Sequence, residues 1–151
     1  MKNMINALAI IAFVLFAFTS SAQDAGFYSK LNQTDSVGAK EFANKLISST
    51  GKDLKLNYKK QKDGLLIFAY NSAVDENDGV IITFYQSDKQ IYSLKSVYGK
   101  FSDLLPFWKD HVSNKLTTDQ LSKSGEIYSL SGSKKIRFRQ YQDLIWSIDL
   151  I

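Results

Sequence analysis

The sequence AVDENDG, residues 73–79, is the most acidic short stretch of the chain, and carboxylate oxygens in a loop are common ligands of Ca²⁺. An EF-hand loop needs oxygen ligands at its first, third and fifth positions, glycine at the sixth and glutamate at the twelfth. With Gly79 at the sixth position, Val74 stands first and Tyr85 twelfth, so the first ligand and the closing carboxylate are missing. We therefore predict a hairpin loop, since Asn and Asp before Gly suit a turn between two apolar runs, with a weak calcium site as the alternative.

The single histidine, His111, is the residue on which acid–base catalysis near neutral pH would depend. A serine hydrolase would need it as the base, oriented by a carboxylate such as Asp103, Asp110 or Asp119. No serine stands in a Gly-x-Ser-x-Gly motif, and His111 is expected on the solvated side of a helix. The 15 acidic residues are spread evenly, which gives no focus for the carboxylate pair of a glycoside hydrolase. We therefore predict no catalytic residue.

The chain contains no cysteine, so a thiol nucleophile, a thiolate metal site and a disulfide are excluded. A single histidine cannot supply a multi-histidine zinc site within one chain. Phosphate-binding motifs of the Gly-x-x-x-x-Gly-Lys and Gly-x-Gly-x-x-Gly types are also missing. We therefore expect neither a metal nor a cofactor, and binding is favoured over catalysis.

A run of basic residues near the carboxyl end is the strongest candidate for a binding surface. In SKKIRFRQY, the apolar Ile136 and Phe138 alternate with charged residues, which predicts a strand with one apolar and one cationic face. The residues that we assign to partner binding are Lys134, Lys135, Arg137, Arg139 and Tyr141. Such a face suits an acidic protein, an anionic glycan or lipid head groups. The alternatives are a solvated strand face and an edge strand whose charge prevents aggregation.

These residues must be positioned by helices and strands whose order the periodicity predicts. Asp35 or Ser36 suits the N-cap of a helix that ends before Gly51, and Lys62-Asp63-Gly64 suits a turn between two strands. The expected elements are a helix within 34–51, strands over 53–60, 65–71, 79–86 and 90–99, a helix over 101–116, and strands over 126–132, 134–142 and 143–151. The short turns between strands predict antiparallel pairing, because parallel neighbours need long crossovers.

Two details of side-chain direction follow from the same patterns. In DLKLNYKK, the residues expected to face the core are Leu54, Leu56 and Tyr58, and those expected to face solvent are Lys55, Asn57 and Lys59. In FSDLLPFWKDH, Phe107 and Trp108 are neighbours, so one of the two is expected to face outward. An outward aromatic residue would add to a binding surface.

Residues 1–22 have the character of a cleaved signal peptide. One basic residue precedes an apolar run over Ala7–Phe18, and Ser20 and Ala22 stand at the spacing that signal peptidase prefers. The run is short for a bilayer core of ~30 Å, so an uncleaved anchor is the less favoured alternative. We expect an exported protein, periplasmic or secreted, with residues 23–151 as one globular domain and no stable membrane insertion after cleavage.

The predicted fold is an α+β domain with an antiparallel sheet, in the order helix, four-strand meander, helix and three strands, with the helices on one face. The leading functional hypothesis is a small exported, non-catalytic binding or inhibitory module that engages a protein or envelope component. One alternative is a carrier or small enzyme that binds an apolar ligand between helix and sheet. Another is a structural or assembly protein of the cell envelope. Export argues against nucleic acid as the partner.

Overall fold

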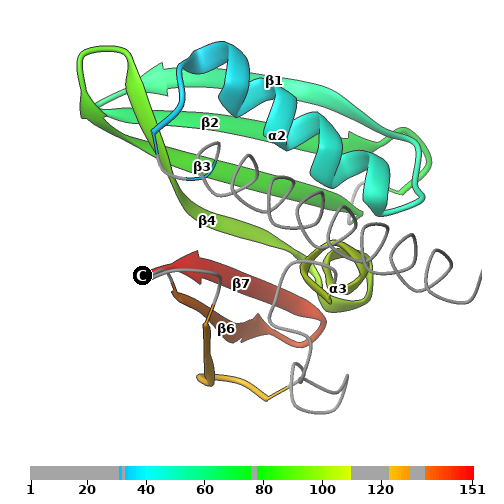
Figure 1. The fold of residues 1–151 in the computed structure, drawn as a ribbon. Helices are drawn as coiled ribbons and strands as arrows, with labels where there is room; N and C mark the ends of the chain where they lie inside the picture. Colours follow the sequence, from blue (N-terminus) through cyan, green and yellow to red (C-terminus); the bar gives the residue numbers. More distant parts are fainter. Residues whose placement is uncertain (1–30, 32, 76–77, 110–122, 130–134) are drawn as a thin grey trace, which may run out of the picture.

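The computed structural model describes residues 31, 33–75, 78–109, 123–129 and 135–151. Within these ranges the chain forms two helices and seven strands. In chain order they are α2 (Ser36–Ser49), β1 (Leu54–Lys62), β2 (Leu65–Ser72), β3 (Gly79–Asp88), β4 (Ile91–Lys100), α3 (Phe101–Lys109), β5 (Ile127–Ser129), β6 (Lys135–Gln142) and β7 (Ile145–Leu150). Figure 1 shows α2 lying along the β1–β4 part of the sheet and α3 beside the end of β4.

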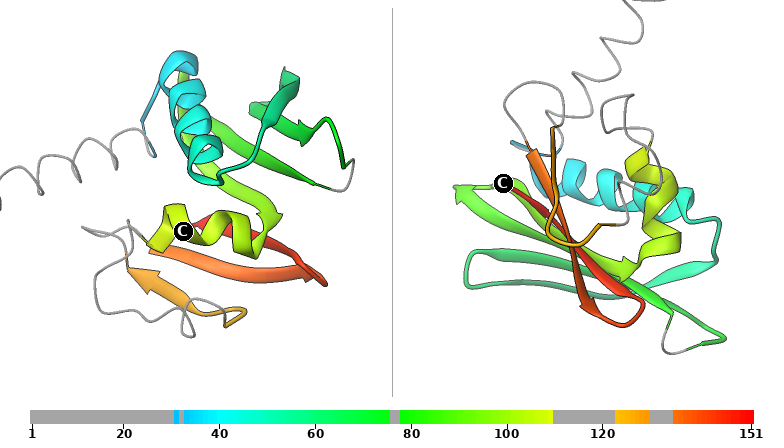
Figure 2. Two further views of the ribbon diagram at one scale, coloured as in Figure 1. Left: turned by 90° about the vertical axis from the view of Figure 1, so that its right-hand side faces the viewer. Right: turned by 90° about the horizontal axis from the view of Figure 1, so that it is seen from below.

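All seven strands join one antiparallel sheet in the order β1-β2-β3-β4-β7-β6-β5. The β1–β4 meander and the β5–β7 meander meet where β4 pairs with β7, with Ser96 opposite Asp149 and Lys100 opposite Ile145. Both helices pack on the same face of this sheet, as the views in Figure 2 show. The predicted α+β architecture and its order of elements are therefore confirmed.

The hairpins form where the turn residues predict them. Asp63 and Gly64, which connect β1 to β2, have φ angles of 53° and 73°, the left-handed pair that a two-residue hairpin turn requires. The acidic stretch 73–79 connects β2 to β3, and the amide of Ser72 donates a hydrogen bond to the carbonyl of Asp78 at 2.9 Å. The predicted hairpin between β2 and β3 is confirmed, and Glu76 and Asn77 of its loop lie outside the described residues.

Helix α2 also begins where the sequence predicts. Asp35 is its N-cap, and the carboxylate accepts a hydrogen bond from the amide of Gly38 at 2.8 Å. Gly51 follows the helix with a φ of 69°, a conformation that glycine adopts without strain. The buried residues of the helix are Ala39, Phe42, Ala43, Leu46 and Ile47.

Helix α3 starts directly after β4 and is buried on two sides. Phe107 and Trp108 are both buried, with ring centroids 5.4 Å apart, so the expectation that one of them faces outward is wrong. The reason is that Phe107 also contacts Phe42 of α2 at 5.7 Å. Helix α2 therefore covers a side of α3 that would be exposed if α3 were the only helix on the sheet.

The core between the helices and the sheet is rich in aromatic rings. Phe84 of β3 contacts Phe42 of α2 and Phe68 of β2, with centroid separations of 5.9 and 6.1 Å. Phe138 of β6 contacts Tyr128 of β5 at 5.5 Å. Edge-to-face pairs of this kind contribute about 0.5–1.5 kcal/mol each beyond the burial of their surface. They stabilise a domain that has no disulfide.

A β-bulge in β1 changes the direction of its side chains. The register shifts between Leu56 and Tyr58, so that Tyr58 lies opposite Ala69 and Lys59 lies opposite Phe68. Tyr58 therefore points away from the helices, and the Nζ of Lys59 lies over the Phe68 ring, 5.8 Å from its centroid. The prediction of an inward Tyr58 and an outward Lys59 is wrong, because one inserted residue reverses the alternation.

Residues 1–30 lie outside the described ranges, so the signal peptide over 1–22 and the export that depends on it stay predictions. The described part of 23–151 shares one sheet and one hydrophobic core. Neither α2 nor α3 is long and apolar enough to cross a bilayer. The predicted functional candidates that also lie outside the described residues are Asp110, His111, Asp119 and Lys134.

Candidate functional site

The face of the sheet that points away from α2 and α3 carries the candidate site, and we call it the open face. One row of directly paired residues crosses six of its strands: Tyr58, Ala69, Ile81, Tyr98, Ser147 and Arg139. Neither helix covers this row (Figure 2). The solvated face of an antiparallel sheet usually carries mainly polar residues. The aromatic and aliphatic members of this row therefore make the open face a candidate binding surface.

Two cationic rims border this row, and strand register places their residues on the open face. The β1 rim consists of Lys55, Lys60 and Lys62, and the β6 rim consists of Lys135, Arg137 and Arg139. β1 and β6 are five strand spacings apart in the sheet order, which separates the rims by about 24 Å. The rims thus lie on either side of an aromatic and apolar middle.

The open face carries more positive charge than the chain as a whole. Its paired strand positions, as far as the structure describes them, hold seven lysines or arginines and two carboxylates: the two rims, Lys100, Asp88 and Asp149. Seven cations minus two carboxylates leave an excess of five, which is larger than the formal net charge of +4 of the chain, so the other positions together are net negative. Positive charge is therefore concentrated on one side, where it attracts anionic partners.

Asp149 of β7 lies between the two arginines of the β6 rim. Its Oδ2 lies 2.6 Å from Nη2 of Arg139 and 3.8 Å from Nη2 of Arg137, and its Oδ1 accepts a hydrogen bond from the hydroxyl of Ser147 at 2.6 Å. Among the described residues, the contacts to Oδ2 are ion pairs without hydrogen-bond geometry. The Asp149 side chain is 11% exposed and that of Arg139 is 52% exposed. Asp149 therefore restrains Arg139 while leaving half of its side-chain surface available to a partner.

The strand that carries the predicted binding residues has the predicted alternation. Ile136 and Phe138 are buried in the core, whereas Arg137 and Arg139 lie on the open face. β6 has β7 on one side and β5 on the other, so the interpretation of this run as a charged edge strand is wrong.

The other predicted binding residues are placed as follows. Lys135 is exposed, and Tyr141 is 68% exposed with its ring centroid 6.2 Å from that of Tyr98. The two tyrosines connect the β6 rim to the aromatic row of the open face. Lys134 lies outside the described residues. The partner-binding role of the whole set remains a prediction.

Short hydroxyl side chains lie between the rims and were not predicted. They belong to the open face but are at most 9% exposed: Thr83, Ser93, Ser96 and Ser147. A bulge at Lys95 puts Ser93 and Ser96 on the same face despite their spacing of three, so simple alternation could not find them. Because these side chains are short, larger neighbours form the outer surface of the face.

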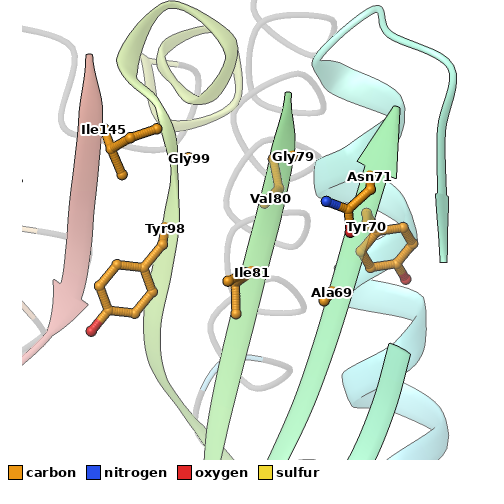
Figure 3. Close-up of a pocket in the computed structure, with 9 residues that line it drawn as sticks. All are labelled: Ala69, Tyr70, Asn71, Gly79, Val80, Ile81, Tyr98, Gly99 and Ile145. Carbon is orange, nitrogen blue, oxygen red and sulfur yellow. The ribbon is translucent and has the colours of Figure 1, made fainter. Parts of the chain in front are cut away.

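A hollow of about 190 Å³ opens in the open face near the start of β3 (Figure 3). Residues that line it come from four strands: Ala69, Asn71, Gly79, Ile81, Tyr98 and Ile145. A Cβ atom at Gly79 would lie 2.8 Å from the carbonyl oxygen of Tyr70 and 3.0 Å from Nδ2 of Asn71. Glycine is therefore required for the close approach of β2 and β3, and it leaves the hollow unfilled.

Beside this hollow, four charged side chains form an ion cluster. Nζ of Lys52 lies 2.8 Å from Oδ2 of Asp78 and 2.7 Å from Oδ2 of Asp103. Nζ of Lys100 lies 3.2 Å from Oδ1 of Asp78. The hydrogen bond from Lys52, reinforced by that from Lys100, holds the pKa of Asp78 below its ordinary value. The hydrogen bonds to Asp103 and Asp78 raise the pKa of Lys52.

The ion cluster has a structural role. It ties the connection after α2 to the β2–β3 hairpin and to the first turn of α3. The side chains of Asp78 and Asp103 are 15% and 9% exposed, so their charges need these partners. In the parts of the chain that the structure describes, no group of three His, Cys, Asp or Glu side chains is arranged to hold a metal ion.

An apolar pocket lies beside α3 and shares Lys100 with the ion cluster. Its volume is about 400 Å³, and its lining residues are Lys100, Phe101, Ser102, Leu105, Leu144 and Trp146. The rings of Phe101 and Trp146 lie 4.8 Å apart and give it an aromatic wall. Leu144, in the β6–β7 turn, is 69% exposed at this site.

No family model, curated protein or solved structure matches the chain significantly.

Proposed function

We propose that this protein is a small exported, non-catalytic binding or inhibitory module, and that its open face engages a protein or envelope component. The observation that carries the proposal is the arrangement of this face, where an aromatic and apolar row lies between two cationic rims. A soluble monomer has no structural need for exposed tyrosines and isoleucine there. Tyr58, Ile81 and Tyr85 are each between 44% and 46% exposed.

The choice of variant for a test follows from the ion pairs. Reversing the charges of Arg137 and Arg139 would place two carboxylates beside the nearly buried Asp149 and would disturb the fold. The lysines of the β1 rim are better targets. Lys60 and Lys62 are exposed, and the nearest ion-pair partner of Lys62 is the exposed Asp63 at 3.7 Å.

The test is affinity capture from envelope extract and culture medium, with the full chain as the cell processes it, followed by identification of the bound molecule. Lys60→Glu/Lys62→Glu should lower the affinity for that molecule by at least about tenfold, because like charges then oppose it at the rim. The control, Lys40→Glu/Lys45→Glu, makes the same charge change on the solvent side of α2 and should bind as the wild type. Equal binding by both variants would refute the assignment of the open face.

A second candidate function is a carrier for an apolar ligand, which the pocket beside α3 favours. The pocket is large enough for a small aromatic or acyl group, and Phe101, Leu105 and Trp146 offer an apolar lining. A fluorescent apolar dye such as anilinonaphthalene sulfonate should then bind with one site per chain. Leu105→Trp should abolish that binding, whereas Tyr85→Trp on the open face should leave it unchanged.

A further inference from the structure

We propose that the partner of the open face is a folded protein with an acidic surface, and that this partner places one apolar side chain in the hollow between Ala69 and Ile145. The inference rests on the proposed function, because it specifies the chemistry of the partner. Three properties of the open face carry it: the sign and distribution of charge, the area, and the position of the hollow.

Charge complementarity requires an anionic partner. The six cationic residues of the rims face two carboxylates at the described strand positions of this face, Asp88 and Asp149, and the charge of Lys100 is paired with Asp78. Juxtaposition of like charges is costly, so a second copy of this chain would not dock its own open face here. Carboxylates about 24 Å apart on the partner would meet both rims at once.

The area of the face fits a folded protein. Seven strands span about 29 Å, and six to eight residues along them span about 20–25 Å, which gives an area of roughly 600–700 Å². Each partner in a standard protein–protein interface contributes ~800 Å². An extended glycan or peptide would cover only one row of residues and would leave the rest of the face exposed. A lipid surface is flat and would leave the hollow empty.

The hollow has the position and lining of an anchor site. It lies between the two rims, and Ala69, Gly79 and Ile81 give it an apolar interior (Figure 3). Tyr98 and Ile145 line the side of the hollow that lies toward the β6 rim. Binding energy at interfaces is concentrated in a few side chains that fill pockets of the partner. An aromatic or branched aliphatic side chain of the partner would fill it and be shielded from water by the contacts around it.

The first experiment is photo-cross-linking in intact cells that make the full chain. p-Benzoylphenylalanine replaces Ile81 at the wall of the hollow or, as the control, Val37, which is 63% exposed on α2. The expected result is a cross-link from position 81, and none from position 37, to an apolar residue flanked by Asp or Glu on a folded protein. A cross-link to lipid or glycan, or no cross-link at position 81, overturns the inference.

The second experiment measures the affinity of the purified cross-linked partner. Ala69→Phe fills the hollow from β2 and should raise Kd by at least about 30-fold, the effect of losing one hot-spot contact. Leu65→Phe places the same ring on the same strand and face, away from the hollow, and should change Kd by less than about threefold. Circular dichroism and thermal unfolding confirm that both variants fold.

The outcomes separate this inference from the proposed function. If Lys60→Glu/Lys62→Glu weakens binding but Ala69→Phe does not, the anchor in the hollow is wrong and the open face is still the binding surface. If neither variant weakens binding, both proposals fail. As a check on partner class, vesicles of phosphatidylglycerol and soluble polygalacturonate should not bind the wild type saturably at physiological salt. Saturable binding to either that the rim variant abolishes overturns the assignment to a protein.

Discussion

The two faces of the sheet are made by the same strands but have opposite compositions. On the covered face, Phe68, Phe84 and Phe138 are fully buried and pack against other aromatic rings. On the open face, the positions next to them in the chain carry alanine, tyrosine and arginine. The comparison teaches that the apolar residues of the open face are not needed to fill the core. Their exposure to solvent is the observation on which the proposed binding function depends.

The largest expected effect separates the two faces at adjacent residues of β3. Phe84→Ala should destabilise the protein by about 3–5 kcal/mol, because it removes a buried ring that contacts Phe42 and Phe68. Tyr85→Ala, one residue further and 44% exposed, should cost less than about 1 kcal/mol. Urea unfolding of both variants measures the difference. Similar losses would mean that the open face also stabilises the fold.

An intermediate effect is expected at the ion cluster, which connects the covered side to the end of the open face. Lys52→Met should cost about 1–2 kcal/mol, since Asp103 loses its 2.7 Å ion pair while Asp78 keeps the one to Lys100. Lys55→Met is the control, because Lys55 and its 3.8 Å partner Asp53 are both largely exposed. An unchanged midpoint for Lys52→Met would show that the cluster does not stabilise the fold.

The same cluster predicts how stability depends on pH. The pKa of Asp78 is lowered in the folded protein, so its contribution is present above its ordinary value of 3.8 and is lost as pH falls below it. The pKa of Lys52 is raised, so its contribution is present below 10.5 and is lost as pH rises above that value. In urea titrations between neutral pH and pH 3, Asp78→Asn should therefore lose less stability than the wild type. Parallel acid profiles for the two proteins would contradict the assignment.

The smallest expected effect on stability is at Tyr141, and a substitution there tests whether the open face binds a partner. Its side chain is 68% exposed and meets the Tyr98 ring at 6.2 Å. Tyr141→Ser should change the free energy of unfolding by no more than about 0.5 kcal/mol. If the open face binds a partner, the same substitution should weaken that binding measurably. Loss of stability without loss of binding would assign Tyr141 to the fold.

Much of the fold could be predicted because its signals are local. The N-cap Asp35, the Asp63-Gly64 turn and the alternation around Phe138 each occupy a few neighbouring residues. The candidate binding residues of the β6 rim followed from that alternation. Binding by them is still untested, but their place on the open face was readable from the sequence.

The rest could not be predicted because it depends on register and on distant contacts. The β-bulge after Leu56 reversed the directions of the Tyr58 and Lys59 side chains. No residue in DLKLNYKK indicates that a bulge occurs there. The ion pair between Lys52 and Asp103 joins residues 51 positions apart in the chain. The hollow is lined by residues of four strands, so Gly79 could be recognised as its floor only once the register of those strands was known.

The pairing of β4 with β7 has a consequence for the order in which the molecule folds. Every other strand pair joins consecutive strands, whereas β4–β7 closes the long stretch of chain between Lys100 and Ile145. Loop closure costs entropy that local hairpins avoid, so we expect the β1–β4 meander to form first and the β5–β7 meander to dock last. Pulsed hydrogen exchange during refolding should show amides of β2 and β3 protected before those of β7. In a newly made chain, the surface between the rims would then be completed in the final step of folding, and a partner would meet a whole site only after that step.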